Sequence, residues 1–389
     1  AQTIGAKYGK DKIAVAISDR YTNEEAYAIK CMADAMGAKV LCMNNRESGL
    51  EKVTGLNASP NTIDELLSTN LILKVGFIAE ESRVIDLKIR QAEEAGAQVM
   101  SVCGCGGVCE DDACDLTTLM GIAKAIVESG KAKKVAGYDE FVASLEGVEV
   151  SEQAKAIADA YLAAKKAMIV YQQNVVSVDA ATLIADIAML SGHIGAPRDG
   201  ILQVKAKNNS QGLVDMGITA GKEALEGVKA LIVFGENADI DTTGLEFLAV
   251  CDTHMTELGA KADVVLPGTG FASIDGTFTN TERRLQLVEA AIDEDVLFNN
   301  WEVAVEIAHI FEVDLDWDGT DDISDEMADV VDAYKYGIIG EVLGGVLAPT
   351  ADAKLVVVEN GKLKDLLPTT DSLMQVIAER LPKPANPTA

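Results

Sequence analysis

Four cysteines occur within twelve residues, in the spacing C-x-C-x3-C-x4-C: Cys103, Cys105, Cys109 and Cys114. Three glycines between the first and the third of them let the backbone curl. Four thiolates so close together suit the sulfur ligation of Zn²⁺ or of an iron–sulfur cluster. The spacing matches neither common ferredoxin pattern, so the sequence leaves three alternatives open: an iron–sulfur cluster, a zinc site, or no metal.

Polar residues follow several of the predicted strands, in loops that begin at Gly235, Asp252, Gly268 and Gly276. In doubly wound sheets, ligands bind beyond the carboxyl ends of the strands, where backbone N–H groups and polar side chains meet. Acid, amide, hydroxyl and guanidinium groups on four such loops predict a site for a large, phosphorylated cofactor. No Gly-x-Gly-x-x-Gly or P-loop follows any strand, so NAD or ATP binding has no support.

The elements that must position these groups alternate between short apolar runs and longer amphipathic stretches. Strands are expected at Ile13–Ser18, Val40–Met43, Leu71–Phe77, Gln98–Cys103, Ala167–Gln172, Ala230–Gly235, Phe247–Asp252 and Asp263–Pro267. Helices are expected at Thr22–Met36, Ser82–Ala95, Asp115–Ser129, Ser151–Lys166, Ala180–Ser191 and Trp301–Phe311. Alternation of this kind predicts an α/β protein with mainly parallel sheets.

The chain is expected to divide into two α/β domains and an extension. The first domain spans residues 1–150 and carries the cysteine cluster. The second spans 151–312, because a new strand series begins at Ala167. Residues 313–389 form an acidic, irregular C-terminal extension and tail.

The charge balance is strongly acidic, with 62 Asp and Glu against 33 Lys and Arg, and a formal net charge of −29. Nucleic acid and anionic membranes both demand a basic face, so the composition disfavours both as partners. Part of the excess lies in Asp314–Asp325. We interpret this run as a solvated acidic face, with a docking surface for a basic partner as the alternative.

The chain has seven cysteines, an odd number, and no basic-then-apolar leader of the secretory type. Thiols without a secretory signal indicate a reducing compartment, where they serve metals or redox chemistry rather than disulfides. No apolar run approaches the roughly 20 residues needed to cross a bilayer. We therefore expect a cytoplasmic protein that associates with membranes only through its partners.

Ala262–Pro267 followed by Asp275–Arg284 strongly resembles the molybdopterin oxidoreductase family. The most similar branches are formate dehydrogenase large subunits and the large iron–sulfur subunit of respiratory complex I. Asn208–Gly212 resembles that family's Asn-Asn-x-Gln-Gly segment, and Thr22–Glu25 and Leu87–Ala92 match in order and spacing. The resemblance implies two doubly wound, Rossmann-like domains, the family's domains II and III.

The resemblance also implies which residues face the groove for the pterin dinucleotide. They are Asn208, Asn209, Gln211, Gly212, Gly235, Glu236, Asn237, Asp252, Thr256, Thr279, Asn280 and Arg283. The alternative is that these loops cap strands and hold the domains together, as in the large iron–sulfur subunit of complex I, which binds no pterin.

Two positions depart from the formate dehydrogenase pattern. A cysteine or selenocysteine followed by histidine serves the metal there, whereas Cys42 is followed by Met43. The arginine upstream of Asn-Asn corresponds to Lys205. Met43 cannot take a proton and Lys205 cannot offer a bidentate fork, so Cys42 is expected to be an ordinary buried thiol and only a weak catalytic candidate.

Two modules of the family are also expected to be missing, namely the N-terminal iron–sulfur module and the C-terminal β-barrel domain. The main hypothesis is therefore a scaffold similar to the large iron–sulfur subunit of complex I (NADH dehydrogenase), in a multi-subunit NADH- or ferredoxin-linked oxidoreductase with other redox subunits as partners. In an electron-transfer family, an iron–sulfur cluster at the four cysteines is favoured over zinc. The alternatives are a truncated formate-dehydrogenase-like catalytic subunit with a molybdenum or tungsten pterin, and a structural subunit without cofactor.

Overall fold

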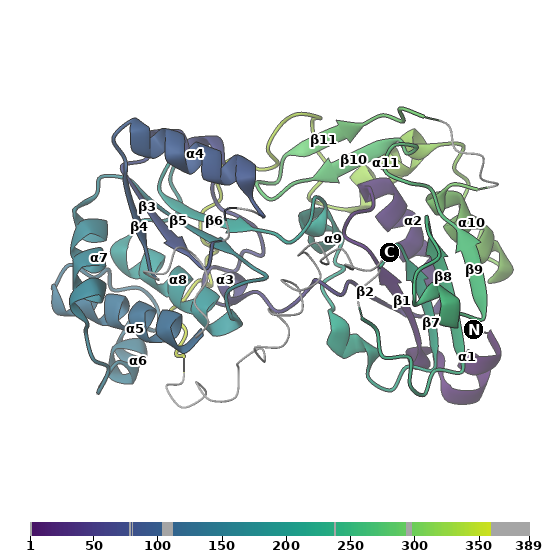
Figure 1. Ribbon diagram of the computed structural model, residues 1–389, viewed down its shortest axis with the longest axis horizontal. Helices are drawn as coiled ribbons and strands as arrows, with labels where there is room; N and C mark the ends of the chain where they lie inside the picture. The colour runs from purple at the N-terminus through teal and green to yellow at the C-terminus, as the bar shows by residue number, and fades with distance from the viewer. Residues whose placement is uncertain are drawn as a thin grey trace, which may run out of the picture. The chain divides into compact units, whose positions relative to one another are not determined.

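The computed structural model describes residues 2–77, 79, 81–102, 112–236, 239–292 and 298–358. The chain forms two compact units (Figure 1). Unit 1 contains residues 1–47, 57–62 and 203–347, and unit 2 contains residues 48–56, 63–202 and 348–389. This division differs from the linear one expected from the sequence, because each unit is assembled from separate stretches of the chain.

The sheet of unit 1 explains why the division is not linear. Its strands run in the order β2-β1-β7-β8-β9, and every neighbouring pair is parallel. Strand β1 (Ile13–Ile17) pairs with β2 (Lys39–Leu41) on one side and with the central strand β7 (Ala230–Phe234) on the other. β8 (Phe247–Asp252) and β9 (Val264–Pro267) complete the sheet. The neighbouring strands β1 and β7 therefore come from two separate stretches of unit 1, residues 1–47 and 203–347.

Helix α2 (Asn23–Met36) connects β1 to β2 and is almost entirely buried. It begins with a capping box, in which Thr22 accepts from the backbone N–H of Glu25 and the Glu25 carboxylate accepts from the backbone N–H of Thr22. It ends at Gly37, in the left-handed conformation. Helix α10 (Asn300–Ile310) packs against it. The remaining helices of unit 1 are α1 (Gln2–Tyr8), α9 (Ser210–Asp215) and α11 (Thr320–Val330).

A β-hairpin and an acidic helix complete unit 1. β10 (Gly276–Thr279) and β11 (Leu285–Val288) pair antiparallel, and neither strand was predicted from the sequence. The acidic stretch after residue 313 was predicted to be irregular, but part of it forms helix α11. It forms because Ile323 and Met327, one turn apart, bury an apolar stripe against α2, while the acidic residues take the outer positions.

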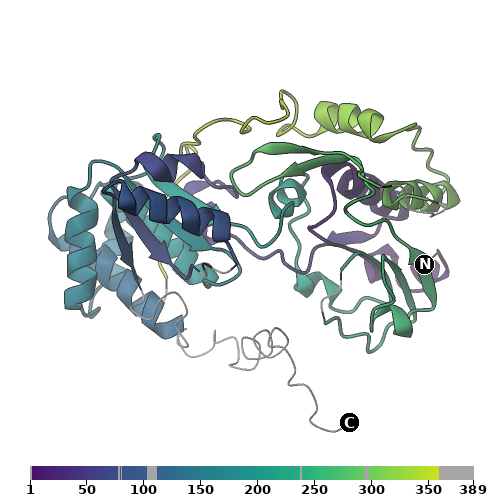
Figure 2. The same cartoon turned by 45° about the horizontal axis from the view of Figure 1, so that its top comes forward.

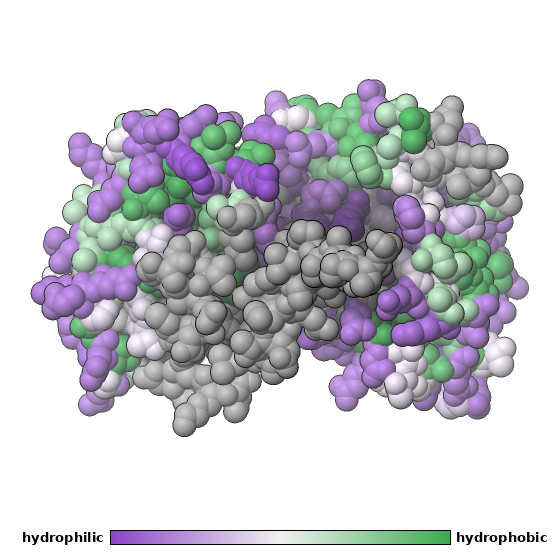
Figure 3. Space-filling model, in the orientation of Figure 1, coloured by the Kyte–Doolittle hydropathy of each residue, from purple (hydrophilic) through white to green (hydrophobic). Residues whose placement is uncertain are grey.

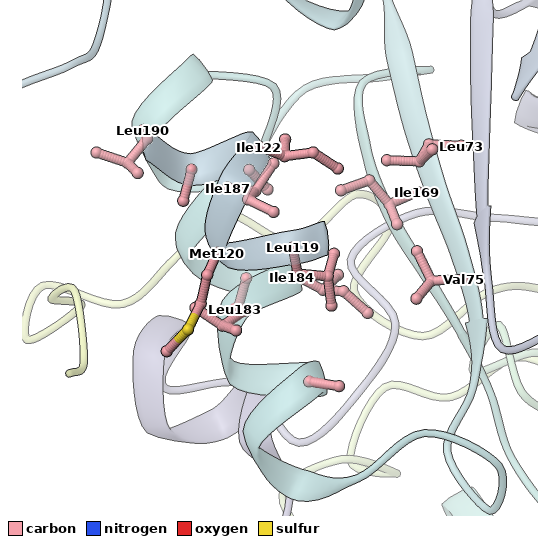
Figure 4. Packing of buried hydrophobic residues seen from close by; sticks show 14 of the residues in the cluster. Leu73, Val75, Leu119, Met120, Ile122, Ile169, Leu183, Ile184, Ile187 and Leu190 are labelled. Carbon is pink, nitrogen blue, oxygen red and sulfur yellow. The ribbon is translucent and has the colours of Figure 1, made fainter. Parts of the chain in front are cut away.

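Unit 2 contains a four-stranded sheet in the order β4-β3-β5-β6. Its strands are β3 (Leu71–Val75), β4 (Gln98–Ser101), β5 (Ala167–Gln172) and β6 (Gly200–Val204). Its helices are α3 (Gly49–Thr54), α4 (Arg83–Glu94), α5 (Asp112–Glu128), α6 (Tyr138–Ser144), α7 (Glu152–Ala163) and α8 (Val178–Ser191). In the core, Leu73 and Ile169 of the sheet lie near Ile122 of α5 and Ile184 of α8 (Figure 4).

The eight strands and six helices expected from the sequence are all present, several of them with shifted ends. The expected α/β class with mainly parallel sheets is confirmed. Within the described residues, no helix has the length and apolar character that a membrane span requires.

Two histidines differ sharply in their surroundings. His193 is buried in unit 2, with Nδ1 2.6 Å from Asp199 Oδ1 and Nε2 2.9 Å from the carbonyl oxygen of Tyr161. A carbonyl only accepts, so Nε2 carries a proton. Burial alone would raise the pKa of Asp199, but the hydrogen bonds from His193 and Ala167 bring it below its ordinary value. His309 is instead exposed beside Asp314.

We expect His193→Ala to lower the free energy of unfolding by about 2–4 kcal/mol, because it removes the donor to the buried Tyr161 carbonyl and one of the donors to the Asp199 carboxylate. Urea unfolding followed by circular dichroism measures the effect. His309→Ala is the matched control, with a change of about 0.5 kcal/mol or less expected at an exposed site. Equal effects of the two substitutions would contradict the structural role of His193.

Candidate functional site

The strand order of unit 1 places a topological switch point between β1 and β7. The chain leaves β1 for β2 on one side, and β7 joins β1 on the other side. In open parallel sheets, ligands bind at such a point, outside the carboxyl ends of the strands. Gly235, with φ 61°, follows β7, and a Cβ there would lie 2.5 Å from the ring of Tyr21. Glycine at this position therefore lets the loops after β1 and β7 approach each other.

Three ionisable side chains are buried at this edge: Asp19 after β1, Cys42 after β2 and Glu236 after β7. The Asp19 carboxylate accepts a hydrogen bond from Asn44 Nδ2 at 2.9 Å and another from Ser210 Oγ. Burial raises the pKa of the Cys42 thiol far above its usual range, and the charges of Asp19 and Glu236 raise it further. Cys42 is thus a protonated, buried thiol beside two carboxylates.

The Asn-Asn-Ser-Gln-Gly segment holds the loop after β1. Asn209 is buried, donates to the Tyr21 carbonyl at 2.8 Å and accepts from the backbone N–H of Thr279 at 2.8 Å. A Cβ on Gly212 would lie 2.1 Å from Asn23 Oδ1 and 2.3 Å from Asn209 Oδ1. Asn209 and Gly212 therefore hold α9 against the start of α2.

Gln211 differs from its neighbours because part of its amide has no partner. Its Nε2 donates to Asp215 Oδ1 at 2.7 Å and to the Asn57 carbonyl at 3.3 Å. Its Oε1 is buried and has no hydrogen-bond partner in the described part of the chain. Unsatisfied buried acceptors are costly, so this oxygen fits a site that receives a donor from a ligand.

Three further residues of the expected site are used within the protein. The Thr279 hydroxyl lies 2.8 Å from Tyr334 Oη and accepts from Asn23 Nδ2 at 3.1 Å. The Asn280 side chain accepts from two backbone N–H groups of its own turn, those of Glu282 and Arg284. Thr256 Oγ1 accepts from the backbone N–H of Gly259 at 3.0 Å.

The guanidinium of Arg283 is buried and donates to main-chain carbonyls. Nε donates to Ser59 at 3.0 Å, and Nη2 donates to Gly345 at 2.6 Å and to Pro60 at 3.5 Å. Nη1 donates to the carbonyl of Leu343. Arg283 thereby joins residues 57–62 to the segment that follows α11.

The structure also describes Lys205 and Met43, the two positions that depart from the formate dehydrogenase pattern. Lys205 is buried, and its Nζ donates to Asn57 Oδ1 at 3.2 Å. Burial raises the pKa of the nearby Asp215 to about 6, although Gln211, Lys205 and Arg283 act to lower it. Met43 packs against an apolar cluster on the sheet.

Of the expected site residues, Asn208 is exposed, whereas Gly235 and Asp252 are half-buried. Asn237 lies outside the described residues, as do Cys103, Cys105 and Cys109, and the side chain of Cys114. Among the residues that the structure describes, no group of three or more His, Cys, Asp or Glu side chains forms a metal site.

Asp19, Ser210 and Asn300 were not predicted as site residues from the sequence. Asp19 could have been found, because it directly follows the predicted strand Ile13–Ser18. Asn300 accepts from the backbone N–H of Thr269 at 3.0 Å and donates to Glu25 Oε1 at 2.6 Å. These contacts join residues far apart in the sequence, and no local pattern signals them.

Comparison with known proteins gives a consistent result. The family model described as molybdopterin oxidoreductase matches residues 1–308. The F420-dependent formate dehydrogenase 2 subunit alpha of Methanococcus maripaludis is 27% identical, over 87% of this chain and 63% of its own length. Formate dehydrogenase H of Escherichia coli is 25% identical, over 88% of this chain and 60% of its own length. The chain thus spans less than two thirds of the length of these relatives.

A solved structure supports the fold. A chain in the formyltransferase/hydrolase complex of Methylorubrum extorquens, solved with methylofuran, aligns with a TM-score of 0.52 at 16% identity. The alignment covers 77% of this chain and 91% of that one. With a family match over most of its length, two α/β units and the motif residues placed at the carboxyl edge of a parallel sheet, the chain belongs to the molybdopterin oxidoreductase family.

Proposed function

We propose that the chain is the pterin-binding core of a formate-dehydrogenase-like oxidoreductase subunit. The observation that carries the proposal is the family match over residues 1–308, with formate dehydrogenase subunits as relatives. These relatives favour the formate-dehydrogenase-like alternative over the hypothesis of a complex I scaffold. The activity, the substrate and the partner subunits of the whole protein are part of this proposal.

The residues at the carboxyl edge of unit 1 fit such a cofactor. Gln211 Oε1 is a buried acceptor without a partner in the described residues, and Gly235 leaves room beside the loop after β1. Gln211, Asn208 and Asp252 would hold polar groups of the pterin dinucleotide, and Cys42 would ligate the metal. When bound, a molybdenum or tungsten pterin supplies a two-electron redox centre.

Cys42 binds a metal only as a thiolate. Its burial and the charges of Asp19 and Glu236 favour the protonated thiol, so a cationic centre has to offset these carboxylates. Met43 cannot accept a proton where the family pattern has histidine. Asp19 and Glu236 are the carboxylates whose charges act on Cys42, and in our proposal their oxygens take the proton that histidine would accept.

Lys205 replaces the arginine that would bind a substrate carboxylate bidentately. Its ammonium group is a single positive point, oriented by Asn57. We therefore propose that a carboxylate substrate is held here by charge and by one hydrogen bond. This arrangement predicts a weaker discrimination between formate and other small oxyanions than a guanidinium provides.

An iron–sulfur cluster at the four clustered cysteines is a second, compatible proposal. It rests on the sequence spacing of Cys103, Cys105, Cys109 and Cys114 and on the redox family. In this proposal the four cysteines would hold the cluster, which would supply a one-electron carrier. Zinc at the same cysteines, or no metal, remain the alternative outcomes of the experiment below.

We expect elemental analysis of the native protein, purified with its partners, to find molybdenum or tungsten, and iron in excess over zinc. Cys42→Ser should lower formate-dependent viologen reduction about 100-fold or more, because it removes a soft thiolate ligand. Cys251→Ser, which alters a buried thiol at the end of β8, is the matched control.

Absence of molybdenum and tungsten from the active native protein would exclude the pterin proposal. Iron that survives Cys105→Ser unchanged would exclude the cluster. Equal losses of activity in the Cys42 and Cys251 variants would show that Cys42 matters only for packing.

A further inference from the structure

Unit 1 contains a groove that is formed by elements other than the carboxyl edge of its sheet. A groove of about 860 Å³ lies between the β10–β11 hairpin and helix α11. The segment after α11, through Tyr334, Gly337 and Ile339, forms another part of its wall. The hairpin and α11 lie side by side in both ribbon views (Figures 1 and 2).

The rim of the groove is acidic on both sides. Asp275 and Glu289 come from the ends of the hairpin, and Asp321 and Asp325 lie one turn apart on α11. All four residues are exposed. Among the described residues that line the groove there is no lysine or arginine. Four carboxylates on opposing walls therefore produce a concentrated negative potential.

The base of the groove is fixed by Glu24, which is buried. Its Oε2 accepts from the backbone N–H of Thr277 at 2.7 Å, and its Oε1 accepts from the Ser324 hydroxyl at 2.8 Å. One carboxylate thus joins the hairpin to α11. The width of the groove is consequently set by buried hydrogen bonds and not by the exposed rim.

Apolar side chains accompany the acidic rim. Leu287 and Ile339 line the groove with 52% and 53% of their surface exposed, and the adjacent Tyr336 and Ile338 are also exposed. The space-filling view shows hydrophobic surface over the hairpin and α11 (Figure 3). Exposed apolar groups gathered within a polar rim are typical of protein-binding surfaces.

Part of the outer edge of β11 has no main-chain hydrogen bond within the described part of the chain. The backbone N–H of Thr277 donates to Glu24 and that of Thr279 donates to Asn209, so both face away from β11. Thr277 and Thr279 lie opposite Leu287 and Leu285. In an antiparallel pair, the backbone N–H and C=O groups of such opposite residues point the same way relative to the partner strand, so those of Leu285 and Leu287 also point away from β10. Leu285 already pairs with Gly340 and Glu341. The next position along this edge is Leu287, which borders the groove.

From these features we propose that the groove binds an extended, amphipathic segment of a partner protein that carries lysine or arginine. Its basic side chains pair with Asp275, Glu289, Asp321 and Asp325. Its apolar side chains pack on Leu287 and Ile339, and its main chain follows the edge of β11. This proposal does not depend on the proposed redox function.

The charge of the chain favours a basic partner segment over a second copy of the chain. A second copy brings a net charge of −29 and the same acidic rim to the interface, so the two surfaces repel. A small cation leaves the apolar half of the groove exposed. A basic amphipathic segment satisfies both the charge and the apolar surface.

The test uses the full chain and a fluorescently labelled peptide of alternating lysine and leucine, measured by anisotropy. Asp321→Asn/Asp325→Asn should weaken binding about five- to tenfold. The matched control is Asp329→Asn/Asp332→Asn, which removes the same charge from exposed positions that do not line the groove. It should change binding less than about twofold.

A second peptide of alternating lysine and serine separates the apolar contribution. Leu287→Ser should weaken the lysine–leucine peptide several-fold and leave the lysine–serine peptide unchanged. Equal weakening by the two double variants would show general charge attraction and overturn the proposal. Magnesium that binds by calorimetry and displaces the peptide, or a dimer that Leu287→Ser dissociates, would also overturn it.

Discussion

Arg283→Ala is expected to lower the free energy of unfolding of unit 1 by about 3–5 kcal/mol. The substitution removes a buried guanidinium that donates to four main-chain carbonyls, those of Ser59, Pro60, Leu343 and Gly345. Without these donors the carbonyls are left desolvated, and the segment after α11 loses two of its hydrogen bonds, those at Leu343 and Gly345. Because the chain has two units, hydrogen exchange of residues 339–347 is the more direct measurement, accompanied by urea unfolding.

Two variants make the interpretation specific. Arg283→Lys retains the charge but offers fewer donors in the wrong geometry, so it should recover less than half of the loss. Arg284→Ala, which breaks one partly exposed pair with Glu282 and one hydrogen bond to Gly340, should cost about 1 kcal/mol. If Arg283→Ala left the exchange of residues 339–347 unchanged, the inferred attachment would be wrong.

Asp186→Asn is expected to stabilise unit 2, and the gain should grow with pH. Asp186 is buried in α8, its Oδ1 accepts from the backbone N–H of Val356 at 3.0 Å, and its Oδ2 has no partner in the described residues. Burial raises the pKa of this carboxyl from 3.8 to about 8. An asparagine keeps the acceptor for Val356 and removes the charge.

The direction of the pH dependence follows from proton binding. Between the ordinary pKa of 3.8 and about 8, native Asp186 holds a proton that the unfolded chain releases. Stability therefore falls as the pH rises through this window, and it levels above it. The advantage of Asp186→Asn should reach roughly 2–4 kcal/mol near pH 8 and be small near pH 4.

Urea unfolding at several pH values measures this slope. Asp159→Asn, at an exposed position on α7, is the control and should show a constant difference. A pH-independent gain for Asp186→Asn would mean that the carboxyl does not bind its proton in the native state.

Most strands of this fold could be predicted from the sequence where burial gives a strong local pattern, although β6, which is also fully buried, was not predicted. β7, whose five residues are all buried, is a continuous apolar run, and the start of α2 is indicated by Thr22 and Glu25. β10 and β11 could not be recognised, because residues such as Thr277 and Leu287 are stabilised by a hairpin and by Glu24 from a distant helix. Likewise, α11 is a helix because of its contact with α2, which overrides its acidic composition.

The candidate site was predictable in its location but not in the use of each side chain. Motif residues fall at the carboxyl edge because parallel strands end there together, which the strand order alone implies. Whether a side chain is free for a ligand depends on long-range partners. Arg283 and Asn209 carry the same functional groups that a phosphate or pterin site uses, yet their hydrogen bonds go to main-chain groups brought near by the fold.

The pairing of β1 with β7 has a consequence for synthesis of the chain. Residues 13–17 leave the ribosome more than two hundred residues before residues 230–234, which complete their hydrogen bonds. Unit 2 is encoded largely in that interval and can collapse around its own sheet first. Until β7 has been synthesised, one edge of the apolar strand β1 has no partner strand and can pair incorrectly. This chain therefore has a long vulnerable period, in which chaperones that shield strand edges should matter most.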